Sequence, residues 1–231
     1  MKIESHAIPG PAGRLEALLN LPSAATADAA GWAAVVCHPH PLFGGTMHNK
    51  VVFHVARSLS GLGWPVLRFN YRGVGASAGH LPRQEGHDAL LRAAAEDLVA
   101  VLDWTAERFP GARVCGAGFS FGAHTLLLAS RRETRVARLL CVGTPAREDH
   151  RAGVFEWAPN VPQPNLFVQG EEDEFGPPQP FRQLYDAAAS PKRLVTIPGA
   201  GHFFDGHLDE LRQAAGEVTG AIGTAPALIH R

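Results

Sequence analysis

Short apolar runs rich in β-branched residues alternate along this chain with longer runs of helical period. The first two short runs are separated only by PGPAG, which predicts a hairpin. Alternation of this kind is typical of a mostly parallel sheet with helices on both faces. The sequence therefore predicts an α/β fold with a doubly wound, mostly parallel sheet of eight strands, at residues 2–8, 14–21, 33–39, 64–71, 112–119, 137–144, 165–170 and 192–199.

Four longer stretches have the spacing of amphipathic helices, at residues 49–63, 88–109, 121–132 and 208–223. In the first of them Val51, Val55 and Leu59 recur at the i, i+4, i+8 spacing of one buried face. Thr46 is the expected N-terminal cap of this helix, because its hydroxyl can accept from a free backbone N–H.

The chain has 231 residues, about half of them apolar, which is enough for one large domain. We find no repeat and no linker, so we expect a single domain over residues 1–231 without a large cap, and a loosely attached tail at 224–231. The oligomeric state is left open between a monomer and a homodimer.

Charge and hydropathy exclude several kinds of partner. The 21 basic and 22 acidic residues leave almost no net charge, so we expect neither nucleic acid nor an anionic membrane as a partner. MKIESHAIPG lacks the apolar segment of a signal peptide, and no later run approaches the roughly 18 apolar residues of a membrane span. These features predict a soluble, cytoplasmic protein that acts on a small molecule.

Three cysteines, Cys37, Cys115 and Cys141, each lie inside an apolar run. Their odd number and wide spacing favour buried, reduced thiols over disulfides. No C-x-x-C pair is present, so the cysteines do not indicate zinc, and we expect neither a metal nor a cofactor.

The stretch GFSFG, residues 118–122, has the G-x-S-x-G spacing of a nucleophile elbow. A predicted strand precedes it and a predicted helix follows it, which is the context that this turn requires. Gly118 and Gly122 are expected to make room for the neighbouring backbone, and Ser120 is the candidate nucleophile. The backbone N–H of Phe121, at the start of the helix, is a candidate oxyanion donor.

A serine hydroxyl needs a base and an orienting carboxylate, and in a fold of this type they follow the serine in the order acid, histidine. Asp173 lies just after the strand at 165–170, and His202 lies in the glycine-rich loop after the last strand. The carboxyl ends of parallel strands share one edge of the sheet, so these residues can meet. Glu172 and His207 are the alternatives.

Four motifs follow one another along the chain: FNYRGVGAS, GFSFG, GEED and GAGH. Together they resemble the α/β-hydrolase superfamily over nearly the whole chain. CHPHPLFGGTMHNKVV, together with GFSFGAH, resembles more narrowly the small, lid-poor bacterial serine hydrolases near the dienelactone-hydrolase-like branch. Dienelactone hydrolases use a cysteine nucleophile, so Ser120 does not imply dienelactone chemistry. The resemblance implies that the backbone N–H of His40 is the second oxyanion donor, since Pro41 has no N–H.

The resemblance implies a serine hydrolase, a carboxylesterase that cleaves small esters through an acyl-enzyme. A thioesterase, an amidase or peptidase, and a non-catalytic protein that binds a small ligand or a partner in the same cleft remain alternatives. The segment 146–163 is too short for a helical lid, which predicts a shallow site. The side chains expected near its rim are Phe43, Phe121, Trp157, Phe175 and Phe203.

Two further hypotheses concern a metal site and a phosphate site. His38, His40 and His48 could hold zinc, but no carboxylate or cysteine accompanies them at a suitable spacing. FNYRGVGASAGH, residues 69–80, is a glycine-rich loop after a strand, but it lacks the lysine of a phosphate-binding loop and opens no helix directly. We expect this loop to shape the rim of the site, with Arg72 bracing it.

Overall fold

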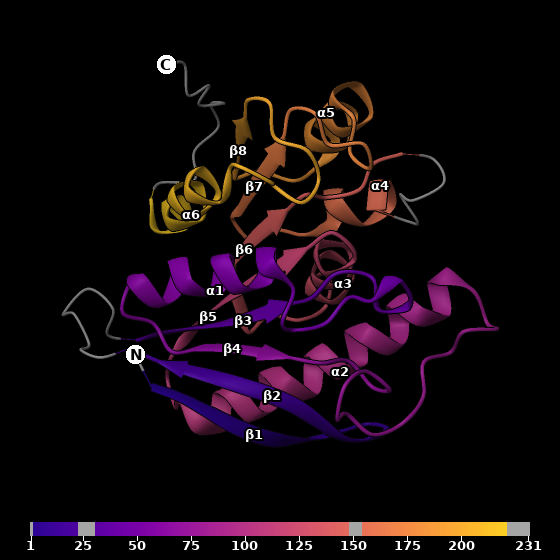
Figure 1. Cartoon of the computed structure of the whole chain (residues 1–231), viewed down its shortest axis with the longest axis vertical. Coiled ribbons are helices and arrows are strands. Elements are labelled where there is room, and N and C mark those ends of the chain that lie inside the picture. Colours follow the sequence, from indigo (N-terminus) through magenta and orange to yellow (C-terminus); the bar gives the residue numbers. More distant parts are fainter. Residues whose placement is uncertain (1, 23–30, 148–153, 221–231) are drawn as a thin grey trace.

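In the computed structural model, which describes residues 2–22, 31–147 and 154–220, eight strands form one sheet (Figure 1). Their order across the sheet is β1-β2-β4-β3-β5-β6-β7-β8. Strand β2 runs antiparallel to both of its neighbours, and all other neighbouring strands are parallel, which confirms the predicted fold class. The strands are β1 (Lys2–Gly10), β2 (Gly13–Leu21), β3 (Trp32–Cys37), β4 (Val66–Phe69), β5 (Arg113–Phe119), β6 (Val136–Val142), β7 (Asn165–Gly170) and β8 (Lys192–Ile197).

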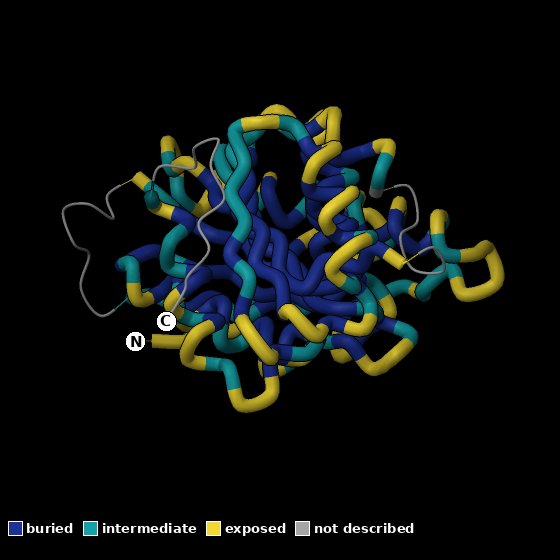
Figure 2. The backbone as a smooth tube through the Cα atoms, turned by 90° about the horizontal axis from the view of Figure 1, so that it is seen from above, coloured by how far each residue is buried: buried dark blue, intermediate teal, exposed yellow. Residues whose placement is uncertain are grey.

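Helices cover both faces of the sheet, as Figures 1 and 2 show. Successive residues of β3 point to opposite faces, so Val35 and Val36 belong to two different core clusters. The cluster of Val36 includes α1 (Lys50–Gly61) and α6 (Leu208–Gly216), whereas that of Val35 includes α2 (His87–Arg108), α3 (Phe121–Ser130) and α5 (Pro178–Ala187). Burial on both faces explains why the central strands are almost entirely apolar.

The cap of α1 differs from the prediction. Asn49 is the N-cap, and its Oδ1 accepts from the Val51 N–H at 2.9 Å. Thr46, the predicted cap, accepts from the His48 N–H at 3.2 Å, so its side chain closes a turn that lies just before the helix. Thr46 and Asn49 are both residues that favour such positions, and the helix begins at the later one.

The direction in which the sheet is built reverses at β3. The chain passes from β3 through α1 to β4 on one side, and then through α2 to β5 on the other side of β3. Loops that follow β3 and β5 therefore diverge at the carboxyl edge of the sheet, where α/β proteins bind ligands. The loop at 38–49 and the turn at Ser120 lie at this point.

Between β6 and β7 the described residues hold only the short helix α4 (Val154–Trp157) and the 3₁₀ turn η3 (Ala158–Asn160). The predicted loose tail at 224–231 lies outside the described residues. Within them, no helix combines the length and apolar character needed to cross a membrane.

The three cysteines are buried and free, as expected. Burial raises the pKa of each thiol to about 12, so none of them is a thiolate at neutral pH.

Candidate active site

The backbone of Ser120 adopts an unusual conformation between β5 and α3, with φ 55° and ψ −119°. A Cβ atom at Gly118 would lie 2.3 Å from the carbonyl oxygen of Gly122. A Cβ atom at Gly122 would lie 2.4 Å from the carbonyl oxygen of Cys37 and 2.8 Å from that of His38. Both glycines are therefore required, because helix α3 starts in direct contact with its own strand and with the end of β3.

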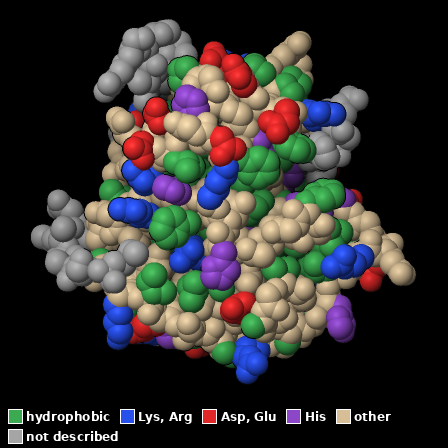
Figure 3. Space-filling model, viewed as in Figure 1, with side chains coloured by type: hydrophobic (Ala, Val, Ile, Leu, Met, Phe, Trp, Pro, Cys, Tyr) green, Lys and Arg blue, Asp and Glu red, His purple; other side chains and the backbone are tan. Residues whose placement is uncertain are grey.

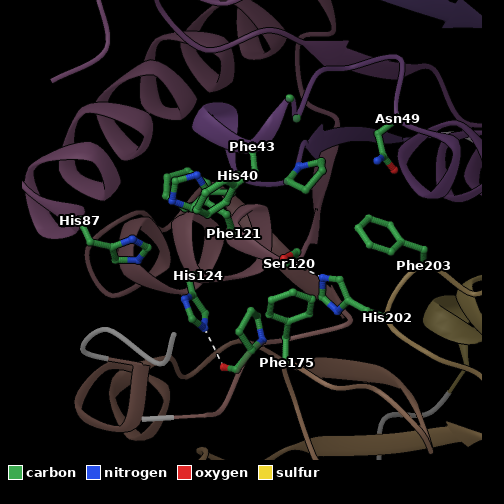
Figure 4. A pocket seen from close by; sticks show the side chains of 14 residues that line it. His40, Phe43, Asn49, His87, Ser120, Phe121, His124, Phe175, His202 and Phe203 are labelled. Atoms are coloured by element: carbon green, nitrogen blue, oxygen red, sulfur yellow. Dashed lines mark hydrogen bonds between the residues drawn. The ribbon is translucent and has the colours of Figure 1, made fainter. Parts of the chain in front are cut away.

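Ser120, His202 and Asp173 form a chain of hydrogen bonds, part of which is drawn in Figure 4. His202 Nε2 lies 3.0 Å from Ser120 Oγ, and His202 Nδ1 lies 2.9 Å from each carboxylate oxygen of Asp173. An ionised carboxylate can only accept, so Nδ1 carries the proton and Nε2 is left to accept from the serine hydroxyl. The side chains are almost wholly shielded from water, at 3% exposure for His202 and 0% for Asp173.

Three donors besides His202 hold the carboxylate of Asp173. Its Oδ1 accepts from the backbone N–H groups of Phe175 at 2.9 Å and Gly176 at 3.0 Å. Its Oδ2 accepts from Gln169 Nε2 at 2.9 Å, and Gln169 Oε1 in turn accepts from the Thr144 N–H at 2.9 Å. These bonds leave the carboxylate little freedom to rotate away from His202.

Sequence reasoning missed Gln169. Its signal was available, because Gln169 is the polar side chain near the end of the buried strand NLFVQG, directly before the loop that carries Asp173. A buried amide in such a strand must find partners, and here they belong to the loops after β6 and β7.

The two candidate oxyanion donors lie on facing segments. Phe121 is the first residue of α3, where backbone N–H groups have no acceptor within the helix. His40 caps the 3₁₀ turn η2 (Pro41–Phe43), and its carbonyl accepts from the N–H groups of Phe43 and Gly45. The rings of His40 and Phe121 lie 4.9 Å apart. The two segments therefore meet beside Ser120.

The buried side chain of His38 connects this loop to the backbone at Tyr71. Its Nδ1 lies 2.7 Å from the Pro39 carbonyl oxygen, and its Nε2 lies 3.3 Å from the Tyr71 backbone nitrogen. A carbonyl only accepts and an N–H only donates, so the ring is neutral with its proton on Nδ1. Burial lowers the pKa of His38 to about 3.

A pocket of about 320 Å³ opens beside Ser120 (Figure 4). Phe43, Phe175 and Phe203 line it, as do His40, His87 and His124, of which the last two were not predicted. Phe43 is 81% exposed and Phe203 is 41% exposed. On the face drawn in Figure 3, hydrophobic side chains interrupt the charged surface across the middle of the molecule.

Trp157 does not line this pocket, contrary to the prediction. It is buried in the core cluster beside α3, with its ring 6.5 Å from that of His124. His124 stands between Trp157 and the pocket, and its Nε2 donates to the Pro145 carbonyl oxygen at 2.9 Å. Trp157 therefore supports the pocket wall from behind.

His207 and the glycine-rich loop at 69–80 lie outside the pocket. His207 is the N-cap residue of α6 and pairs with Glu210 at 3.8 Å. The loop after β4 does not line the pocket, contrary to the prediction. Arg72 does brace this loop, as predicted, by holding it to α2 through bonds to the buried carboxylate of Asp97 at 2.8–2.9 Å. Among the residues that the structure describes, no cluster of histidine, cysteine and acidic side chains suits a metal ion.

Residues 33–161, more than half of the chain, match the family model for the serine aminopeptidases, S33, a group of hydrolases. The chain belongs to this hydrolase family.

Two relatives of this S33-family hydrolase share about a third of its residues. One is an α/β serine hydrolase without a lid from Xanthomonas campestris, 32% identical, with a TM-score of 0.82 over 97% of both chains. The other is an uncharacterized protein of Rickettsia prowazekii, 31% identical over 89% of this chain and 84% of its own. A dienelactone hydrolase from Anabaena variabilis, 23% identical, has the same fold, with a TM-score of 0.73 over 94% of this chain and 97% of its own. The resemblance drawn from the motifs is confirmed.

The lowered pKa of His38 predicts a loss of stability in acid. An unfolded histidine takes up its proton near pH 6.5, whereas His38 in the folded hydrolase does so only near pH 3. Unfolding therefore binds a proton between these values, and stability falls by up to about 1.4 kcal/mol for each pH unit below 6.5.

Urea unfolding at pH 7.5 and pH 5.0 measures this effect. Between these values the wild-type protein should lose about 1 to 2 kcal/mol more than His38→Gln, whose amide can make both hydrogen bonds without titrating. His207→Gln, at the half-exposed start of α6, is the control and should behave as wild type. Equal losses in wild type and His38→Gln would contradict the assignment.

Proposed function

We propose that this S33-family hydrolase is a carboxylesterase that cleaves small esters through an acyl-enzyme. The observation that carries the proposal is the buried hydrogen-bond chain from Ser120 through His202 to Asp173. His202 takes the proton of Ser120 as the serine oxygen attacks the ester carbonyl, and it then gives that proton to the leaving alcohol. Water, activated by His202 in the same way, releases the acid and restores Ser120.

Asp173 orients His202 and stabilises the imidazolium that forms in each half of the reaction. The negative oxygen of the tetrahedral intermediate accepts from the backbone N–H groups of Phe121 and His40. Removing one such donor typically costs about 10²–10³ in rate. This chemistry uses side chains and backbone alone and needs no metal or cofactor.

Thioesters and amides could be attacked by the same three residues, and a panel of esters, thioesters and amides with one acyl group separates these activities. A protein that only bound a ligand would have no use for the strained Ser120 backbone or for a histidine held on both sides. The local geometry therefore favours catalysis over binding alone.

The first test uses Ser120→Ala. Removing the nucleophile should abolish esterase activity while the melting temperature changes little, because only the hydroxyl is lost. Mass spectrometry after treatment with a fluorophosphonate should find one adduct, on Ser120, in the wild-type protein and none in the variant. An adduct on another residue would refute the assignment.

The second test compares the partners of Ser120. His202→Ala should be as inactive as Ser120→Ala, whereas Asp173→Asn should keep more activity, because the orienting acid is usually the least costly member to lose. His207→Ala is the matched control and should retain wild-type kcat/KM. If His207→Ala were the inactive variant, the base would have been misassigned.

The third test concerns chain length. The described part of the segment 146–163 holds only short turns of helix, and the pocket beside Ser120 holds about 320 Å³. Each methylene group gains about 0.8 kcal/mol only while it is buried, so atoms beyond the pocket add little. Across p-nitrophenyl esters of straight-chain acids, kcat/KM should be greatest for acyl groups of about two to six carbons.

No rate increase should appear when the ester concentration passes its solubility limit. An optimum at long chains, together with such an increase, would mean that the chain closes over the site as a lid does.

A further inference from the structure

One wall of the pocket beside Ser120 is built from aromatic rings in mutual contact. The ring of His40 lies 4.6 Å from that of Phe43, 4.9 Å from that of Phe121 and 5.5 Å from that of His87. The rings of His87 and Phe121 lie 5.8 Å apart at 89°. These separations fall within the range of favourable ring pairs. The four residues come from three segments of the chain, and we call them the ring wall.

Phe175 and His124 line the pocket on the side that faces the ring wall in Figure 4, and Pro145, which is bonded to His124, also lines the pocket. The bond from His124 Nε2 to the Pro145 carbonyl oxygen fixes the orientation of its imidazole. Phe175 lies against His202, with ring centroids 4.6 Å apart. Both sides of this part of the pocket are therefore held in place before any ligand enters.

Among the described residues, those that line the pocket include no lysine, arginine, aspartate or glutamate, so a charged group would lose water beside them without gaining an ionic partner. The volume of the pocket also limits the size of the group that can enter it. A cavity of about 150 Å³ holds one benzene ring, so the 320 Å³ pocket has room for one ring and the reacting ester group. A neutral group with a single ring fits both constraints.

The proposed mechanism decides which part of the ester enters this space. The leaving oxygen must face His202 Nε2 to receive its proton, so the alcohol lies on the side of His202 and Phe203. Figure 4 shows His87 and His124 on the other side of Ser120 from Phe203. The acyl group extends toward them, along the ring wall.

From this arrangement we infer that the acyl group of the preferred ester carries one neutral aromatic ring, held between the ring wall and His124. The inference rests on the proposed ester hydrolysis at Ser120. It names the substrate class of that site, since ring pairs of this kind favour an aromatic group over a saturated one of equal size.

The test compares p-nitrophenyl phenylacetate with p-nitrophenyl cyclohexylacetate, which have the same carbon skeleton and leaving group and differ in whether the ring is aromatic. Each kcat/KM is divided by the rate of hydroxide hydrolysis of the same ester, which removes the difference in intrinsic reactivity. The corrected ratio should favour the phenyl ester about three- to tenfold.

Variants of His87, the first residue of α2, locate the preference. His87→Leu should bring the ratio close to one, whereas His87→Phe, which keeps a ring, should preserve it. Phe203→Leu lies on the side assigned to the alcohol and is the matched control, so its ratio should equal that of the wild type. Hydrolysis of p-nitrophenyl butyrate by each variant reports whether the reaction itself is intact.

A wild-type protein that hydrolyses the butyrate at Ser120 but shows no preference for the phenyl ester would overturn the inference and leave the proposed function standing. A preference lost in Phe203→Leu but kept in His87→Leu would place the ring on the alcohol side and also overturn it. If neither ring ester nor the butyrate is hydrolysed and no phosphonate adduct forms on Ser120, the proposed function fails and the inference fails with it.

Discussion

Helix α3 begins in direct backbone contact with the end of β3, and the arrangement of the site depends on this contact. Only a residue without a side chain fits at Gly122, where the carbonyl groups of Cys37 and His38 lie against the helix. The contact holds Ser120 in a conformation with positive φ, which packing on every side must maintain. It also brings the first N–H groups of α3 beside the loop that carries His40.

A second set of contacts joins the loops after three neighbouring strands. Gln169, on β7, bonds both to Thr144 after β6 and to Asp173, and Asp173 reaches His202 after β8. Each donor offsets part of the cost of burying a carboxylate, and together they leave it little freedom to rotate. The two ends of the proposed triad are thus held by different parts of the sheet edge, Ser120 by β5 and Asp173 by β6 and β7.

The histidines of this chain show how far environment decides the role of a residue. His38 is buried, neutral and bonded to the backbone on both sides, whereas His202 has a carboxylate on one side and a serine hydroxyl on the other. His207, five residues after His202, starts a helix. The sequence favours His202 for two reasons. It follows Ser120 and Asp173 in the chain, and it lies just after a strand, at the sheet edge where those two residues also lie. The error at Thr46 arose because a second residue of suitable type, Asn49, lies three positions later in the chain.

The sequence by itself determined the fold class, the elbow and the order of the candidate triad. Hydrophobic periodicity reports which face of an element is buried, and the glycine spacing around Ser120 reports a turn that few other residues can make. Only the tertiary structure decided that Gln169 braces Asp173, that Trp157 lies behind His124 and that His87 reaches the pocket. Periodicity does not say which distant segments meet, and this pocket is lined by side chains from segments that the sheet brings together across more than 160 residues of chain, from Pro39 to Phe203.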